Sequence, residues 1–433
     1  MRKYIKVIQN FSKNLDVVQS FLASLEKMME FNKVGGELEK IDKLKEVKDV
    51  SKKIAAILEK LKHSENNLSP EIIEELNGDF DLGDISVTGG NSLKISFRDS
   101  DVGEGFAEFI KISDLSNKQV AMIYTSSLIN LVVYFELLAN KLIQMRLENY
   151  PETMNIKQKM LSFKEIEDIG SIEEAKKYLI QQEVISLMNS GFLTWMEYFK
   201  RNFKVEVKGS SAPLDKINEI FSRRHLYVHN EGIVSSIYLS RVKAEYKGEA
   251  KLGKKLKISE AYLLDSLEAI KSFGLLLALE TWRREEKESE DRHEFILDFG
   301  FGTMKNKEWK ISSELYYFLL NEQKITSGTL YMAKMNYWLC MKNLGRLEDF
   351  RSEIEAEDFS ALDPAFIICR EALLDNYDKL FSMLDNQLGY SIKLKELENW
   401  PIFEDLRNHE KYQEFIAGKS QGELNIISDL TVK

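Results

Sequence analysis

The chain has very few residues that interrupt helices. Only five of its 433 residues are proline, and they lie far apart in the sequence. Proline removes a backbone donor and clashes with the preceding helical turn, so long proline-free stretches can stay helical. Apolar residues also recur at three- and four-residue intervals over several segments, which is the period of a helix face. We therefore predict a mainly α fold.

Residues 1–118 are predicted to form helices and one small β-hairpin. The helical pattern covers residues 3–62, with a break at Gly35-Gly36. Residues 85–87 and 93–97 alternate between apolar and polar side chains on either side of residues 88–92, which is typical of a hairpin. Because a lone hairpin needs a surface to pack on, we expect this region to be an accessory or sensor module.

Residues 119–288 are predicted to form a helical bundle. Its apolar patterns indicate helices over residues 121–147, 172–199, 214–229 and 259–284. The charge run over residues 283–294 then predicts a helix end, followed by a solvated linker at 289–304.

Residues 305–433 are predicted to form a further helical domain. The stretches 343–347 (NLGRL) and 376–380 (NYDKL) align at a spacing of 33 residues, each between apolar-periodic segments. This pattern resembles helix–turn–helix repeats of about 34 residues, as in TPR arrays. A non-repetitive helical bundle remains the alternative.

The net charge limits how the chain can contact nucleic acid. It carries 60 basic and 70 acidic residues, a formal net charge of −10, whereas proteins that coat nucleic acid usually present a basic surface. Residues 241–257 are the exception, with seven basic residues against two acidic ones. This basic segment is interpreted either as an approach groove for RNA or as a solvated loop.

The sequence predicts a cytoplasmic protein without a membrane segment. The first residues lack the apolar core of a signal peptide, and the apolar stretch 128–138 is broken by Asn130 and Glu136 and is short for a bilayer. The two cysteines, Cys340 and Cys369, do not form a disulfide framework or, alone, a zinc site.

The predicted helix at residues 214–229 carries an arginine among apolar residues. Its apolar stripe comprises Ile217, Ile220, Phe221 and Val228, and position 224 in that stripe is arginine, whereas Arg223 is expected on the opposite, polar side. An arginine in an apolar stripe needs a carboxylate, a phosphate or a hydrogen-bond network to replace its hydration. Glu136 is a candidate partner, either in a salt bridge that seats two helices or in a catalytic role.

Two histidines share a flank of the same helix. His225 and His229 are four residues apart, and Asn230-Glu231-Gly232 indicates a helix end with glycine in a left-handed cap. The negative end of a helix raises a histidine pKa, so proton exchange near neutral pH is expected here. An arginine beside an imidazole suits phosphodiester cleavage without a metal. A zinc half-site lacks a third ligand, so no metal is predicted. The other histidines, expected at the surface, are His63, His293 and His409.

Residues 223–234 resemble the signature of HEPN (higher eukaryotes and prokaryotes nucleotide-binding) domains. Their sequence is Arg223-Arg224-His225-Leu226-Tyr227-Val228-His229-Asn230-Glu231-Gly232-Ile233-Val234. Ribonucleases of that family carry an arginine, four to six residues, and then a histidine, on an all-α bundle. The resemblance covers roughly residues 118–285. It implies catalytic roles for Arg224 and His229 and an auxiliary role for His225, with Arg223 giving an alternative spacing. The residues expected to bind RNA or phosphate are Arg223, Asn230, Arg241, Lys243 and Lys247.

The same resemblance implies an activity and an assembly. It implies a metal-independent and cofactor-independent RNA endonuclease that homodimerises through the bundle, as a regulated toxin or antiviral abortive-infection effector. The C-terminal helical domain is the expected site for a protein partner. The alternative is a non-catalytic dimeric HEPN scaffold, or a nucleotide-binding module, that recruits a protein partner.

Overall fold

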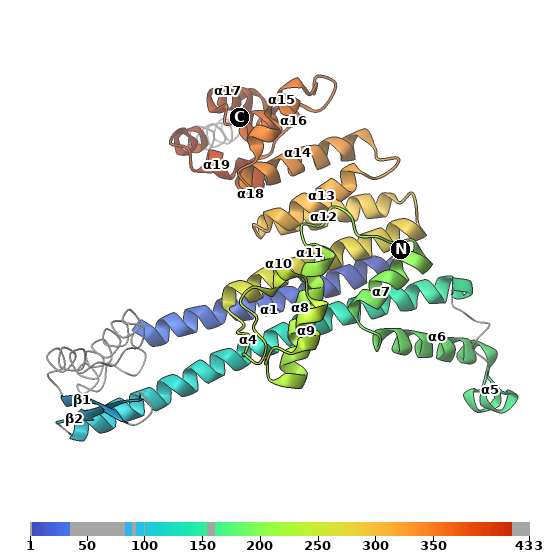
Figure 1. Ribbon diagram of the computed structural model, residues 1–433. Coiled ribbons are helices and arrows are strands. Elements are labelled where there is room, and N and C mark those ends of the chain that lie inside the picture. Colours follow the sequence, from blue (N-terminus) through green and yellow to red (C-terminus); the bar gives the residue numbers. More distant parts are fainter. Residues whose placement is uncertain (1, 35–82, 89–91, 99, 154–160, 418–433) are drawn as a thin grey trace, which may run out of the picture. The chain divides into compact units, whose positions relative to one another are not determined.

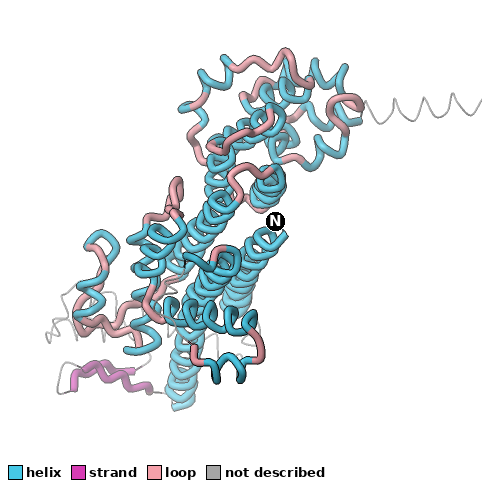
Figure 2. Tube along the Cα trace, turned by 90° about the vertical axis from the view of Figure 1, so that its right-hand side faces the viewer, coloured by secondary structure: helices cyan, strands magenta, loops and turns pink. Residues whose placement is uncertain are grey.

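The protein is a mainly α structure, as predicted. The computed structural model describes residues 2–34, 83–88, 92–98, 100–153 and 161–417, and helices dominate these ranges (Figures 1 and 2). Residues 1–15, 131–255 and 265–433 form one compact unit, and residues 16–130 and 256–264 form a second. The residues of the predicted C-terminal domain thus group with those of the bundle.

The N-terminal predictions are confirmed where the structure describes them. Helix α1 (Arg2–Val34) forms the first part of the predicted helical pattern, whereas the predicted break at Gly35-Gly36, the helical residues after it and His63 lie outside the described residues. Strands β1 (Gly83–Thr88) and β2 (Ser92–Phe97) pair antiparallel, from Gly83 opposite Phe97 to Thr88 opposite Ser92. The two strands are the only magenta segments in Figure 2.

Helix α4 (Ser100–Asn149) begins well before the predicted start at residue 121. The next proline is Pro151, where the short 3-10 helix η2 (Pro151–Thr153) begins. With no proline inside it, the helix runs unbroken through the predicted domain boundary at residue 118.

The predicted helix over residues 172–199 is interrupted. The structure has α5 (Phe163–Ile169), α6 (Ile172–Met188), α7 (Phe192–Tyr198) and a π-helical turn, η4 (Phe199–Phe203). The break falls at Gly191, whose φ of 95° is not helical. The Ser190 hydroxyl donates to the Leu187 carbonyl at 2.6 Å and stabilises the end of α6.

An aromatic cluster holds the bundle helices together. The remaining bundle helices are α8 (Leu214–Asn230), α9 (Ser236–Arg241), α10 (Ala244–Lys247) and α11 (Glu260–Glu285). Phe135 of α4 packs edge-on against Phe221 of α8, with ring centroids 5.7 Å apart, and tilted against Phe273 of α11 at 6.1 Å. Phe192 of α7 stacks on Phe221 at 4.7 Å. Four helices therefore share one aromatic core.

The predicted linker at 289–304 is a helix instead, α12 (Glu290–Lys305). Arg292 in the charge run is completely buried, and its guanidinium donates to both carboxylate oxygens of Glu322, at 2.7 and 3.1 Å. It also donates to the Glu286 carbonyl at 2.6 Å. His293 is buried too, and His409 is half-buried against the Tyr377 ring, so their predicted surface positions are wrong. A charged side chain can be buried when it is fully paired. The charged composition of this segment therefore could not predict that Arg292 is buried.

The C-terminal part alternates helices and short turns, but the predicted repeat register is wrong. The turns after α14 and α16 share a left-handed residue, Gly345 (φ 72°) and Asp375 (φ 58°). Each is followed by an N–H that donates back into the helix, from Arg346 to Met341 at 2.8 Å and from Asn376 to Glu371 at 2.9 Å. The equivalent turns are therefore 30 residues apart, not 33. The elements of this part are α13 (Trp309–Leu320), α14 (Ser327–Asn343), η5 (Leu347–Asp349), α15 (Arg351–Ala356), α16 (Pro364–Leu373), α17 (Tyr377–Gln387), α18 (Leu394–Asn399), η6 (Pro401–Phe403) and α19 (Glu404–Arg407).

One part of α4 is long and apolar enough to cross a membrane by length and composition. It comprises Asn117–Asn149, with a mean hydropathy of 1.5 in its most apolar window. The sequence interpretation, which considered residues 128–138 only, underestimated this length. Phe135 in this segment packs into the aromatic core, and Glu136 pairs with a side chain of α8. Core helices of water-soluble proteins commonly have this composition, so the segment is weak evidence for a membrane span.

Close helix packing at Gly274 predicts a large effect of a single methyl group. A Cβ at Gly274 of α11 would collide with the Phe11 ring of α1 and lie 3.0 Å from Leu138 Cδ2. We expect Gly274→Ala to lower the free energy of unfolding by about 1–3 kcal/mol through overpacking. Gly302→Ala in α12 is the matched control, since nothing lies within 4 Å of its Cβ position. It should raise stability by about 0.5–1 kcal/mol. Chemical denaturation of both variants tests the pair, and equal effects would contradict it.

Candidate functional site

Helix α8 ends at the predicted place, directly after the second histidine. Glu231 (φ 51°) and Gly232 (φ 82°) are both left-handed, and the Gly232 N–H donates to the Leu226 carbonyl at 3.0 Å. A Cβ on Gly232 would lie 2.8 Å from the Tyr227 ring, so glycine is required there. The Asn230 side chain, predicted to bind RNA, donates to the Ile233 carbonyl at 2.6 Å. This hydrogen bond stabilises the turn that follows α8.

Arg224 faces Glu136 of α4, as predicted. The Arg224 Nη2 atom lies 3.5 Å from Glu136 Oε1, and both side chains are about one-quarter exposed. Arg224 Nε is buried and has no hydrogen-bond partner among the described residues. Burial raises the pKa of Glu136 more than the Arg224 charge lowers it. The ion pair is therefore loose, and the guanidinium keeps unused donors.

His225 and His229 lie side by side on the exposed end of α8. Their ring centroids are 4.5 Å apart, and both residues are exposed. The pKa of His225 is lowered from 6.5 by partial burial first, and then by the charges of His229, Arg241 and Arg224. A raised pKa from the helix end was expected, and for His225 it is wrong because desolvation and the positive charges of neighbouring side chains lower the pKa. His225 is mainly neutral near pH 7.

The arginine that enters the core is Arg223, not an exposed residue as predicted. It is 7% exposed, and its Nε donates to Glu219 Oε1 at 2.7 Å. The Tyr238 hydroxyl of α9 donates to the same oxygen at 2.7 Å. Helix α9 folds back over this flank of α8 and buries it, so the predicted role of Arg223 in binding phosphate is wrong. Val228, expected in the apolar stripe, is instead 46% exposed.

The basic segment returns to the end of α8. Arg241 is exposed, Lys247 is half-exposed, and Lys243 forms an ion pair with Asp215 at 2.5 Å. Ile233 bridges Lys255, and the Val234 N–H donates to the Lys254 carbonyl at 3.0 Å. These backbone contacts hold the exposed lysines of residues 251–255 next to the turn that follows His229.

The sequence interpretation missed Glu219 and Tyr238, which fix the buried flank of α8. The spacing of Glu219 and Arg223, four residues apart on a helix, was a usable signal for an ion pair. Tyr238 carried no such signal, because only the tertiary structure brings α9 against α8. Within the described ranges, no group of three or more His, Cys, Asp or Glu residues is arranged to hold a metal ion.

Comparisons with known proteins do not assign the chain to a family. No protein-family model matches it, and no curated protein or solved structure shows significant similarity to it.

The buried pair in α8 predicts a stability difference between two ion pairs of equal spacing. Glu219→Gln should lower the free energy of unfolding by about 3–5 kcal/mol, because it removes the carboxylate charge that faces the buried Arg223 guanidinium. Glu197→Gln is the matched control, since its partner Arg201 is also four residues away but 76% exposed. That change should cost less than about 1 kcal/mol. Denaturation curves of the two variants measure both values, and a tolerated Glu219→Gln would contradict the burial.

The charges around His225 predict a titration that can be followed directly. NMR of the imidazole resonances should give His225 a pKa below 6.5. Arg241→Gln should raise that pKa because it removes a nearby positive charge, whereas Arg201→Gln, a change outside this cluster, should leave it unchanged. A His225 pKa at or above the ordinary value, or one insensitive to Arg241, would show that this cluster does not form in solution.

Proposed function

We propose that the chain is a metal-independent RNA endonuclease of the HEPN type. The observation that carries the proposal is the arrangement at the end of α8: a half-buried arginine with unused donors beside two exposed imidazoles. Arginine binds phosphate oxygens through two parallel hydrogen bonds, and imidazoles exchange protons near neutral pH. The resemblance of residues 223–234 to the HEPN signature supports the same activity.

The chemistry would be an internal displacement at phosphorus. The ribose 2′-oxygen attacks the adjacent phosphorus as its proton passes to an imidazole, and the bond to the 5′-oxygen breaks as that oxygen takes up a proton. The products are a 2′,3′-cyclic phosphate and a free 5′-hydroxyl. The lowered pKa of His225 suits a proton acceptor, and His229, whose ring centroid lies 4.5 Å from that of His225, would donate the proton that the 5′-oxygen takes up. Arg224 would stabilise the negative charge that develops on the phosphate oxygens.

RNA would approach over the basic segment. Arg241 and the lysines of residues 251–255 are exposed, and with the half-exposed Lys247 they form a positive edge beside the motif. Positive charge next to a cleavage site raises the rate of encounter with a polyanion and makes it salt-dependent. The alternative is that this segment is a solvated loop. In that case, replacing these basic residues should change the rate of RNA cleavage little.

Further proposals follow from the family resemblance. The enzyme would act in the cytoplasm as a homodimer that brings two motifs together, with its N-terminal region as a sensor and its C-terminal helices as the site for a protein partner. A regulated toxin or antiviral abortive-infection effector fits this organisation.

A second function is favoured by the ion pair between Arg224 and Glu136. In a non-catalytic scaffold or nucleotide-binding module, this pair seats α8 on α4 and the bundle recruits a protein partner. The 3.5 Å separation and the unsatisfied Nε argue for the nuclease, since a purely structural arginine normally has its donors filled.

Arg224→Ala and His229→Ala should each abolish RNA cleavage and cellular toxicity, because each removes a group that acts on the reacting phosphate. A loss of at least about 100-fold is expected for each, while the fold and the dimer persist. Cleavage of a fluorescent single-stranded RNA and a growth assay measure the two effects. Arg201→Ala, an exposed arginine of the same unit, is the matched control and should retain full activity.

Two outcomes would overturn this proposal. If both variants degraded RNA as fast as the wild type, the motif would not be catalytic. If EDTA abolished wild-type activity, the reaction would need a metal ion. A wild type that is inactive on RNA but stably dimeric would favour the scaffold.

A further inference from the structure

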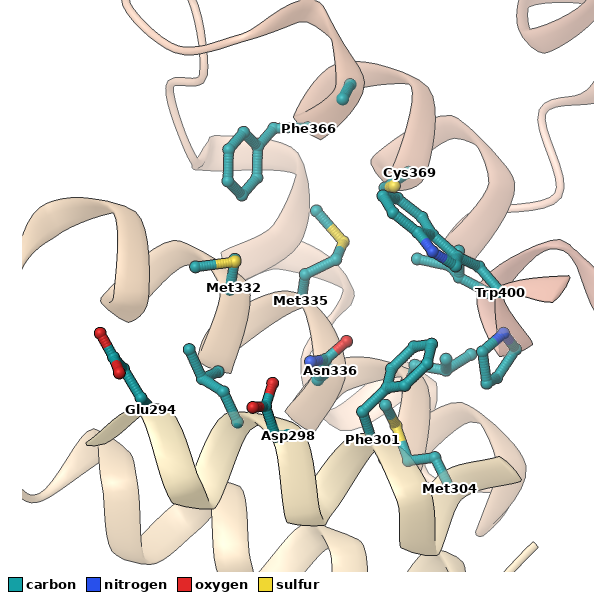
Figure 3. Close-up of a pocket in the computed structure, with 15 residues that line it drawn as sticks. Glu294, Asp298, Phe301, Met304, Met332, Met335, Asn336, Phe366, Cys369 and Trp400 are labelled. Carbon is teal, nitrogen blue, oxygen red and sulfur yellow. The ribbon is translucent and has the colours of Figure 1, made fainter. Parts of the chain in front are cut away.

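A second feature of chemical interest lies among the C-terminal helices, in the compact unit that contains residues 265–433. An open cavity of about 610 Å³ is lined by α12, α14, α16 and the start of η6 (Figure 3). Its size is in the range of cavities that bind ligands or anchor side chains of a partner. The nuclease motif contributes no residue to it.

Most of the lining is apolar and adaptable. Met304, Met332 and Met335 line the cavity together with the rings of Phe301, Phe366 and Trp400. Met332 is 43% exposed although it is apolar. Methionine side chains are flexible and polarisable, and they are over-represented on surfaces that bind apolar helices of varied sequence. This wall therefore suits an apolar guest that reaches it from solvent.

One rim of the cavity is negative. Glu294 and Asp298 project toward it from α12 (Figure 3), and they are one helical turn apart and exposed. Neither carboxylate has an ion-pair partner among the described residues, and no lysine, arginine or histidine lines the cavity. Some other acids of this part of the chain are paired, such as Glu371 with Arg370 and Lys379 at 2.8 Å. A ligand or partner segment that fills the cavity would therefore lie beside two unpaired carboxylates, unless it carries a positively charged group that pairs with them.

We propose that this cavity docks a basic amphipathic helix of a partner protein. The helix would insert apolar side chains from positions i and i+3 or i+4 among the methionines and aromatic rings. A lysine or arginine at its rim would pair with Glu294 or Asp298. The two carboxylates are four residues apart on α12, so their spacing matches that of successive cationic side chains on one face of the partner helix. This docking rests on the partner site proposed above for the C-terminal helices, and its test does not depend on nuclease activity.

Selection from a displayed library of 16-residue helical peptides, with the full chain as bait, tests the proposal. The enriched peptides should carry apolar residues at helical spacing and at least one lysine or arginine beside them. Fluorescence anisotropy with one synthesised winner then measures affinity. Glu294→Lys/Asp298→Lys should weaken binding by about tenfold or more through like-charge repulsion. Met332→Ala should also weaken it, because it removes apolar side-chain surface from the wall without changing the charge. Glu410→Lys, an exposed charge reversal away from the cavity, is the matched control and should leave affinity unchanged.

The alternative occupants are outcomes of the same experiment. Enrichment of acidic peptides, or winners that bind the double variant as tightly as the wild type, would overturn the proposal. If no peptide is enriched but octylamine quenches the fluorescence of the wild type and not of Trp400→Phe, the cavity is a small-molecule site and the proposal fails. If sedimentation shows that the double variant alone loses self-association, the occupant is a second copy of this chain, which also overturns it. All substituted side chains but Trp400 are exposed, and circular dichroism verifies the fold of each variant.

Discussion

The contact between Phe135 and Phe221 is the constraint from which the candidate site follows. These rings meet edge to face at 5.7 Å in the aromatic core of α4, α7, α8 and α11. Glu136 follows Phe135 directly, and Arg224 lies about one helical turn beyond Phe221. Once the rings pack, the carboxylate and the guanidinium are brought within 3.5 Å of each other. The apolar core thus places a polar pair at its own edge, and loss of that packing would separate the pair.

Three arginines of the chain differ in burial and in how completely they are paired. These two properties distinguish an arginine with a structural role from a candidate functional one. Arg223 and Arg292 are buried, and each donates to a buried carboxylate, Glu219 or Glu322. Such pairs are costly to break, and they fix the position of neighbouring helices. Arg224 is only partly buried, its carboxylate partner is 3.5 Å away, and Nε has no partner among the described residues. An incompletely satisfied arginine beside two imidazoles is the kind of exception that marks functional sites in an otherwise consistent structure.

The two proposed surfaces have opposite chemistry on an acidic chain. The end of α8 joins cationic side chains and imidazoles, which suit a polyanion, whereas the rim of the cavity at α12 carries two carboxylates and suits a cation. The net charge of −10 is thus distributed so that positive charge is concentrated near one motif. RNA and a basic partner helix, as proposed, would therefore not compete for the same charges.

The sequence by itself determined the helical class, the hairpin and the end of α8, and it singled out Glu136 as a candidate partner of Arg224. Helical periodicity, turn residues and a scarcity of proline are local signals, and an arginine in an apolar stripe needs a carboxylate, a phosphate or a hydrogen-bond network to replace its hydration. The tertiary structure alone decided that Arg223 and Arg292 are buried, that the charge run at residues 283–294 contains the start of a packed helix, and that the pKa of His225 falls. Each of these depends on which distant segment covers the residue, as α9 covers Arg223. Local sequence cannot specify that partner, because burial and electrostatic environment are properties of the packed chain.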